Sequence, residues 1–178
     1  MNDPRYSEVV VRELPPMHVV SYRAIGAAPE EDAARVMAEW MAGWVDGWLA
    51  EQRLPPTRNF GFDVEVTPEQ QRAGLRGYEL WLAAPRGTEP GEDMVARRFH
   101  GGLYAVMTIY DALDDPFARI PAGWEYLHNW VAAHPQYEPA EHQLLEEVVV
   151  DADAEPDGQR RHLVIYYPVA AIAIGEPA

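Results

Sequence analysis

The fold is decided by Tyr78–Ala84 (YELWLAA), an apolar run that ends at Pro85. A counterpart, His162–Val169 (HLVIYYPV), follows about half a chain later and ends around Pro168. Both runs are rich in aromatic or β-branched residues, so each predicts a closing strand. Two such strands at matching places indicate that one unit occurs twice.

The first copy extends outward from its closing strand. We predict strands over Ser7–Arg12 and His18–Ala24, a helix over about Glu31–Gln52 and a strand over Phe60–Val66, followed by a loop. The helix begins with acidic residues after Pro29, and apolar residues recur at helical spacing along it. This stripe consists of Val36, Trp40, Met41, Trp44, Val45, Trp48 and Leu49.

The second copy follows a linker, Arg86–Asp93, that is rich in Gly, Pro and acidic residues. It repeats the order with strands over Val95–His100 and Leu103–Tyr110, a helix near Ala122–Ala133 and a strand over Leu144–Val150. The second apolar stripe consists of Trp124, Leu127, Trp130 and Val131.

This repetition predicts an α+β fold, a tandem duplication of a β-α-β-β type unit. Residues 1–178 would form a single domain, with a first half of about 6–86 and a second half of about 94–170. Neither helix can bury its stripe alone, so each needs a sheet to pack on. We expect an antiparallel sheet with two long helices on one side and a central ligand cleft on the other.

Composition and charge exclude several function classes. The net charge of −15, from 29 acidic and 14 basic side chains, opposes direct binding of nucleic acid and favours cations. The absence of cysteine excludes disulfides and thiolate catalysis. No apolar run approaches the roughly 20 residues that span a bilayer, so we expect a cytoplasmic protein that does not enter membranes. The six histidines lack metal-ligand spacing, and no nucleotide-binding or hydrolase motif occurs; we expect no metal and no cofactor.

Four stretches carry a family resemblance. They are Val9–Gly26; Phe60–Asp63 with Tyr78-Glu79; Gly101–Val106 with Trp124–Trp130; and Tyr137–Ala140 with Leu145-Glu146 and Tyr166–Val169. In this order they resemble the gyrase-inhibitor-like superfamily, whose domains also serve as effector-binding domains of AraC- and MerR-type multidrug regulators. The chain departs from the family at Tyr110-Asp111-Ala112, where a glycine is usual, and at Val148, where an aromatic residue is common.

The resemblance implies two fused β-α-β units with a central cleft for flat, lipophilic and often cationic ligands. It also implies a buried glutamate among aromatic residues, and the motif position assigns this role to Glu146. Glu147 would point to the opposite face of the strand. A buried carboxylate needs a partner, which a cationic ligand would provide. The alternatives are a Glu146 that faces water or pairs with an arginine.

Aromatic residues are the other candidate ligand contacts. Tyr104, Trp81 and Tyr166 fall on strands expected to line the cleft, although the choice between Tyr166 and Tyr167, and the side to which Trp81 points, depend on which face each strand presents. The helical candidates are Trp44 and Trp130, which could equally belong to the core stripes.

Three functions fit this pattern. The first is a sensor or sequestering protein for lipophilic small molecules, without a DNA-binding domain. The second, which the resemblance implies, is a hydrolase of cyclopropane-containing DNA-alkylating natural products, with Glu146 as general base and Tyr104 or Tyr166 as a helper. The third, least favoured, is a protein interaction of the topoisomerase-inhibitor type.

Overall fold

The computed structural model describes residues 3–44, 58–150 and 160–172. The chain forms two compact units. Unit 1 comprises Met1–Pro15 and Gly101–Ala178, and unit 2 comprises Pro16–His100.

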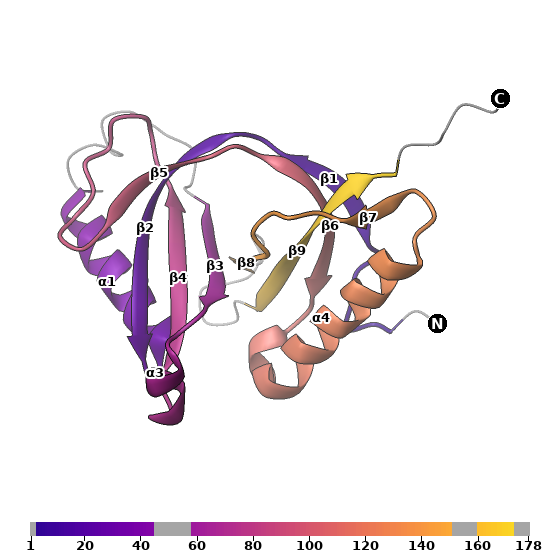
Figure 1. Cartoon of the computed structure of the whole chain (residues 1–178), viewed down its shortest axis with the longest axis horizontal. Helices are drawn as coiled ribbons and strands as arrows, with labels where there is room; N and C mark the ends of the chain where they lie inside the picture. Colours follow the sequence, from indigo (N-terminus) through magenta and orange to yellow (C-terminus); the bar gives the residue numbers. More distant parts are fainter. Residues whose placement is uncertain (1–2, 45–57, 151–159, 173–178) are drawn as a thin grey trace. The chain divides into compact units, whose positions relative to one another are not determined.

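Unit 2 is an antiparallel sheet with one long helix on it (Figure 1). Its strands lie in the order β3-β4-β2-β5, with bounds β2 Met17–Gly26, β3 Asn59–Val64, β4 Arg76–Ala83 and β5 Val95–Phe99. The helix α1 (Pro29–Trp44) packs on β2 and β4. Val20, Met37 and Leu82 form the centre of this core, and each is at most 2% exposed.

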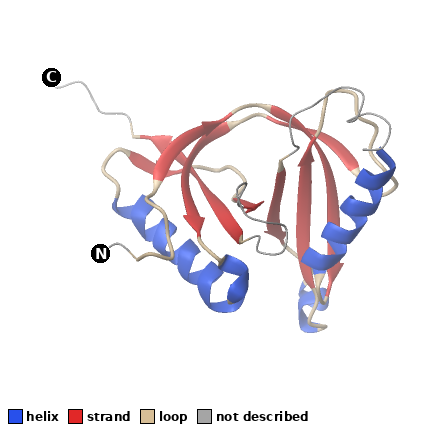
Figure 2. Cartoon of the chain, turned by 180° about the vertical axis from the view of Figure 1, so that it is seen from behind, coloured by secondary structure: helices blue, strands red, loops and turns tan. Residues whose placement is uncertain are grey.

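Unit 1 has the same construction (Figure 2). Its strands lie in the order β1-β6-β9-β8, with bounds β1 Val10–Leu14, β6 Gly102–Ile109, β8 Leu145–Val150 and β9 Arg161–Ala171; the short β7, Tyr137–Pro139, also pairs with β9. The helix α4 (Pro116–Ala133) covers one face of the sheet. Leu127 of α4 packs with Met107 and Ile165, and all three are fully buried.

Each unit takes its edge strand from the other half of the sequence. β1 comes before unit 2 in the chain but pairs with β6, with Leu14 opposite Gly102. β5 comes after β4 and pairs with β2, with Met17 opposite Phe99. The remaining elements follow one order in both units, β2-α1-β3-β4 and β6-α4-β8-β9. The structure confirms the predicted α+β class, the antiparallel pairing and the two longer helices.

Two local predictions were wrong. The second helix begins at Pro116 rather than near Ala122, because the Asp115 side chain caps it by accepting a hydrogen bond from the Ala118 N–H at 3.4 Å. Pro121, which directly precedes the predicted start, lies inside the helix. The loop after β3 contains a short helix, α3 (Pro68–Arg72), whose first turn is closed by a reciprocal capping box between Thr67 and Gln70.

Two further observations concern the predicted helices. The first of them begins at Pro29, and its predicted end, with Val45, Trp48 and Leu49, lies outside the described residues. None of the helices in the described ranges combines the length and apolar character needed to cross a bilayer.

Candidate functional site

Each sheet has one face that its own helix does not cover. In unit 1, Met107 and Ile165 face α4, so the neighbouring positions point the other way. The helix-free face of unit 1 therefore carries Tyr104, Val106, Leu145, Glu147 and Tyr166, since Tyr166 is paired with both Val106 and Leu145.

Glu147 and two tyrosines form a buried polar cluster on this face. The Tyr166 hydroxyl donates a hydrogen bond of 2.5 Å to Oε2 of Glu147. Tyr166 is 5% exposed and Glu147 8%. The Tyr104 ring meets the Tyr166 ring edge-on, with centroids 6.2 Å apart. A carboxylate and two aromatic rings thus lie together away from bulk water.

Tyr104 acts in this cluster as a neutral phenol. It is fully buried, and its hydroxyl donates to the Gln143 carbonyl at 3.2 Å. Burial raises the pKa of Tyr104 to about 12. The hydroxyl is therefore a hydrogen-bond donor at neutral pH and not a base.

Glu146 lies on the other side of the same strand. It is paired with Ile165, which faces α4, and its Oε1 accepts a hydrogen bond of 2.8 Å from Trp124 Nε1. Tyr167 also lies on the α4 side, with its hydroxyl 3.0 Å from His128 Nδ1. The structure thus brings Tyr104 and Tyr166 together and separates both from Glu146.

The helix-free face of unit 2 is aromatic and contains a second buried carboxylate. Trp81 meets Phe62 edge-on, with ring centroids 5.0 Å apart, and lies 5.8 Å from Phe99. Glu79, two positions before Trp81 on β4, is 1% exposed. Trp81 therefore does not belong to the α1 core.

Both carboxylate oxygens of Glu79 have N–H partners, from two arginines and an indole. Oε2 accepts from Arg23 Nε at 3.0 Å and Arg23 Nη2 at 2.8 Å. Oε1 accepts from Trp81 Nε1 at 2.8 Å and lies 3.4 Å from Arg97 Nη1. Glu79 belongs to the family pattern through Tyr78-Glu79 but was not among the predicted site residues. A sequence feature could have identified it, because Glu79 is the one acidic residue in the apolar run Tyr78–Ala84.

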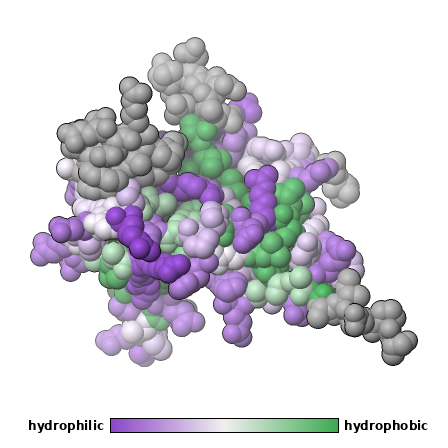
Figure 3. All heavy atoms as spheres, turned by 90° about the horizontal axis from the view of Figure 1, so that it is seen from above, coloured by the Kyte–Doolittle hydropathy of each residue, from purple (hydrophilic) through white to green (hydrophobic). Residues whose placement is uncertain are grey.

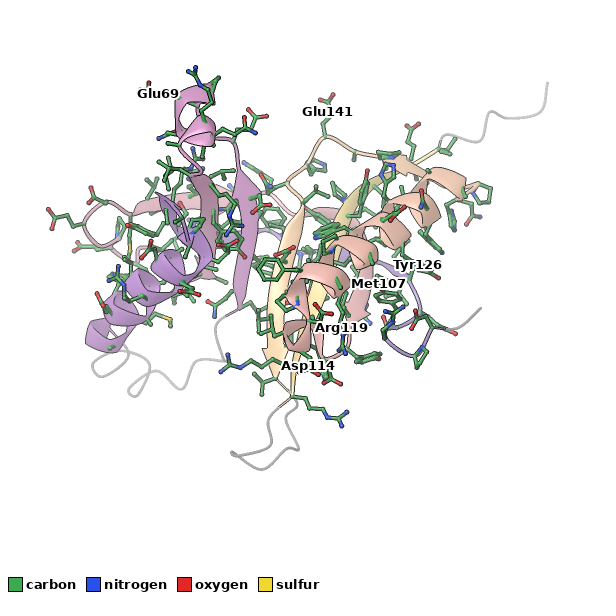
Figure 4. The ribbon with its side chains drawn as sticks, turned by 90° about the horizontal axis from the view of Figure 1, so that it is seen from below. Glu69, Met107, Asp114, Arg119, Tyr126 and Glu141 are labelled. Carbon is green, nitrogen blue, oxygen red and sulfur yellow. The ribbon has the colours of Figure 1, made fainter. Side chains whose placement is uncertain are left out.

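The two helical candidates differ in what the structure describes. Trp130 packs against the α4 core, lies 4.4 Å from the His134 ring and lines a pocket of about 440 Å³ with Tyr6 and Tyr126. Figure 4 shows Tyr126 on α4 beside the N-terminal segment. Trp44 is the last residue of α1, and its side chain lies outside the described residues.

The surface and the titratable groups add two observations. On the face seen in Figure 3, polar side chains interrupt the apolar ones. Within the described part of the chain, no three His, Asp or Glu residues lie close enough together to hold a metal ion.

Comparison with protein families gives one match. Residues 7–170 match the family described as the GyrI-like small molecule binding domain. A search of curated proteins found no similar sequence.

Solved structures show the same fold at low identity. The C-terminal domain of EcmrR is 15% identical with a TM-score of 0.62, covering 93% of this chain and 98% of that one. SAV2435 bound to tetraphenylphosphonium is 11% identical with a TM-score of 0.51, covering 92% and 94%. A hydrolase from Listeria innocua is 10% identical with a TM-score of 0.57, covering 92% of each chain.

The full EcmrR chain, solved in complex with DNA, is longer than this one. It is 12% identical with a TM-score of 0.62, and the match covers 96% of this chain but 59% of EcmrR. This chain therefore spans about three fifths of the EcmrR chain.

Proposed function

The chain belongs to the GyrI-like small-molecule-binding family, and we propose that it binds flat, lipophilic cations as a sensor or sequestering protein. The observation that carries the proposal is the buried carboxylate of Glu147 beside Tyr104 and Tyr166.

The chemistry of this cluster favours a cation. The Tyr166 phenol is a neutral hydrogen-bond donor, so it adds no positive charge of its own beside the Glu147 carboxylate. In a medium of low dielectric constant, a cation beside a carboxylate gains more than it does in water. The π faces of Tyr104 and Tyr166 add further attraction for a lipophilic cation. The net charge of −15 steers cations toward the protein.

A structural relative supports the same ligand class. SAV2435 was solved with tetraphenylphosphonium, a lipophilic cation. We extend that ligand class to this chain as part of the proposal.

We propose Tyr104, Tyr166 and Trp81 as ligand contacts. For the carboxylate, the motif position assigns Glu146, whereas the orientation of β8 favours Glu147 on the helix-free face with the tyrosines. Trp44 remains a predicted contact. Trp130 also remains one, although its contacts with α4 and His134 favour a packing role.

The duplication belongs to the proposal as well. The repeated order β2-α1-β3-β4 and β6-α4-β8-β9 supports a tandem origin. The central cleft, with both helices on one side of a shared sheet, stays a prediction.

The test is calorimetric titration with tetraphenylphosphonium and with tetraphenylborate, which has a similar shape and the opposite charge. We expect the cation to bind more tightly than the anion. Glu147→Gln should weaken cation binding about tenfold, a loss of about 1.4 kcal/mol. Glu146→Gln, with the same charge change on the opposite face, should leave binding within about twofold.

Two results would revise this proposal. A loss in Glu146→Gln alone would return the role to the residue that the motif assigns. Equal binding of the two tetraphenyl ions, unaffected by either substitution, would refute a carboxylate-dependent cation site.

A hydrolase is the second candidate, favoured by the carboxylate–phenol pair of Glu147 and Tyr166 and by the fold shared with a Listeria innocua hydrolase. A carboxylate on this face would remove a proton from water as its oxygen attacks a carbon of a strained cyclopropane. The ring bond breaks, its electron pair passes to a conjugated acceptor group, and the phenol supplies the proton there. The motif assigns the base to Glu146, with Tyr104 or Tyr166 as helper.

Mass spectrometry tests this second candidate. Incubation with a cyclopropane-containing electrophile should give the water adduct faster than buffer does, and Glu147→Gln or Glu146→Gln should abolish the gain. A rate equal to that of buffer across such substrates would remove the hydrolase candidate.

A further inference from the structure

The cluster around Glu79 carries an excess positive charge. Glu79 contributes −1, and Arg23 and Arg97 contribute +1 each, so the three side chains sum to +1 in a chain whose net charge is −15. The two arginines and the Trp81 indole supply the donors to both Glu79 oxygens. Glu79 is therefore occupied within the protein, and the charge presented outward is that of the arginines.

The arginines retain donors for a further group. A guanidinium has five N–H donors. Arg23 directs Nε and Nη2 at Glu79, and Arg97 directs Nη1 there. The two side chains are 51% and 45% exposed, so their remaining N–H groups are accessible. Guanidinium groups bind carboxylates in a bidentate manner, and Glu79 orients these two before any ligand arrives.

An aromatic surface adjoins the arginines. Trp81 is held by its hydrogen bond to Glu79, by a T-shaped contact with the Phe62 ring and by a tilted contact with the Phe99 ring. Phe62 and Phe99 are buried, while Trp81 is partly exposed. A flat ring can thus stack on Trp81 while a group attached to that ring reaches the arginines.

We propose that the helix-free face of unit 2 binds an aromatic carboxylate. Arg23 and Arg97 hold the carboxylate group, Trp81 stacks on the ring, and Glu79 positions all three side chains. The inference rests on the proposed function through Trp81, a residue assigned to ligand binding above. It adds an anionic subsite to a protein proposed to take cations.

The experiment compares 2-naphthoate with 2-naphthamide, a neutral molecule of the same shape, by calorimetry. We expect wild-type protein to bind the naphthoate about tenfold more tightly than the amide. Arg23→Gln and Arg97→Gln should each weaken naphthoate binding five- to tenfold without changing amide binding.

Arg98→Gln is the matched control. Arg98 is the next residue on β5 and is paired with His18, so its side chain points to the opposite face from Arg97. The substitution changes the net charge equally, and we expect naphthoate binding within about twofold of wild type. Thermal unfolding of each variant verifies folding. Arg23→Lys keeps the positive charge but lacks the paired N–H groups of a guanidinium, so it should give an intermediate loss of naphthoate affinity.

The outcomes separate this inference from the proposed function. Equal binding of naphthoate and naphthamide by wild type overturns the anionic subsite, as does an equal loss in Arg98→Gln and Arg97→Gln. Tetraphenylphosphonium is titrated into the same samples. Cation binding without arginine-dependent naphthoate binding overturns the subsite alone. The reverse result overturns the cation proposal and supports the subsite.

Discussion

Glu79 in unit 2 and Glu147 in unit 1 are both buried carboxylates on a helix-free sheet face beside aromatic rings, yet their partners differ. Glu79 is held by two guanidiniums and an indole N–H, whereas a phenol donates to Glu147. The two arginines beside Glu79 carry more positive charge than its carboxylate carries negative charge, whereas the Tyr166 phenol brings no charge to Glu147. Two buried acids in similar aromatic surroundings thus receive side-chain donors of different charge, guanidiniums at Glu79 and a phenol at Glu147.

The acid and the aromatic residue beside it lie on opposite members of the equivalent strand pair in the two units. In unit 2 the acid is on β4, with Phe62 opposite it on β3. In unit 1 the acid is on β8, the counterpart of β3, and Tyr166 is on β9, the counterpart of β4. One topology thus supports two faces of different charge.

The largest expected contrast is in stability. Glu79→Ala removes the acceptor of a buried indole N–H and the partner of two arginines, so we expect the free energy of unfolding to fall by about 3 kcal/mol. The value lies at the low end for a broken buried ion pair because the arginines can turn toward water. Glu147→Ala should cost about 1–2 kcal/mol, since one phenol loses its acceptor. Urea denaturation measures both, and equal losses would show that the partners do not distinguish the two acids.

A smaller contrast separates two tryptophans that donate to carboxylates at the same distance. Trp81 Nε1 lies 2.8 Å from Glu79 and Trp124 Nε1 lies 2.8 Å from Glu146. We expect Trp81→Phe to destabilise the protein by about 1 kcal/mol more than Trp124→Phe, because water can replace the lost donor at the half-buried Glu146 but not at Glu79. Denaturation midpoints test this difference, which would vanish if Glu79 were hydrated.

The third contrast, the smallest at neutral pH, is in how stability depends on the titration of Tyr104. Its folded-state pKa of about 12 lies above the ordinary tyrosine value of about 10, so the folded protein holds the phenolic proton more tightly than the unfolded chain. The resulting stability is fully present below pH ~10 and is lost as the pH rises through ~12. Tyrosinate absorbance should show a late-titrating contribution that Tyr104→Phe removes. The unit 2 cluster depends on guanidiniums, which stay protonated in this range.

Much of the fold followed from the sequence because apolar periodicity is a local property. The predicted strand Val95–His100 and the observed β5, Val95–Phe99, differ by one residue. The start of α4 was predicted near Ala122, too late by about six residues, because the sequence offers a second proline at Pro121, whereas Asp115 and Pro116 carry the capping chemistry. The pairing of β1 with β6 was not foreseen, because nothing within Val10–Leu14 specifies a partner so distant in the chain.

The site was harder to predict because β8 has apolar and acidic residues on both faces. In Leu145–Val150, the alternation that normally assigns faces is obscured by two adjacent glutamates. Only the register with β9 shows that Glu147, rather than Glu146, shares a face with Tyr166. Tyr104 and Tyr166 were predicted only to lie on strands that line the cleft. The structure shows that these strands pair, and the ring contact depends on a register that the sequence does not encode locally.

The position of β1 in the chain, before unit 2 but paired with β6, also affects the order in which the two units fold during synthesis. Leu14 lies opposite Gly102, so unit 1 contains a hairpin whose turn is interrupted by the whole of Pro16–His100. Unit 2 is continuous in sequence and is complete on the ribosome before the first residue of β6 is made. β1 is synthesised before unit 2, so it has to wait as an unpaired segment until translation has passed through all of unit 2. Biosynthesis thus places the folding of unit 2 first and makes closure of this hairpin one of the later events in the maturation of the chain.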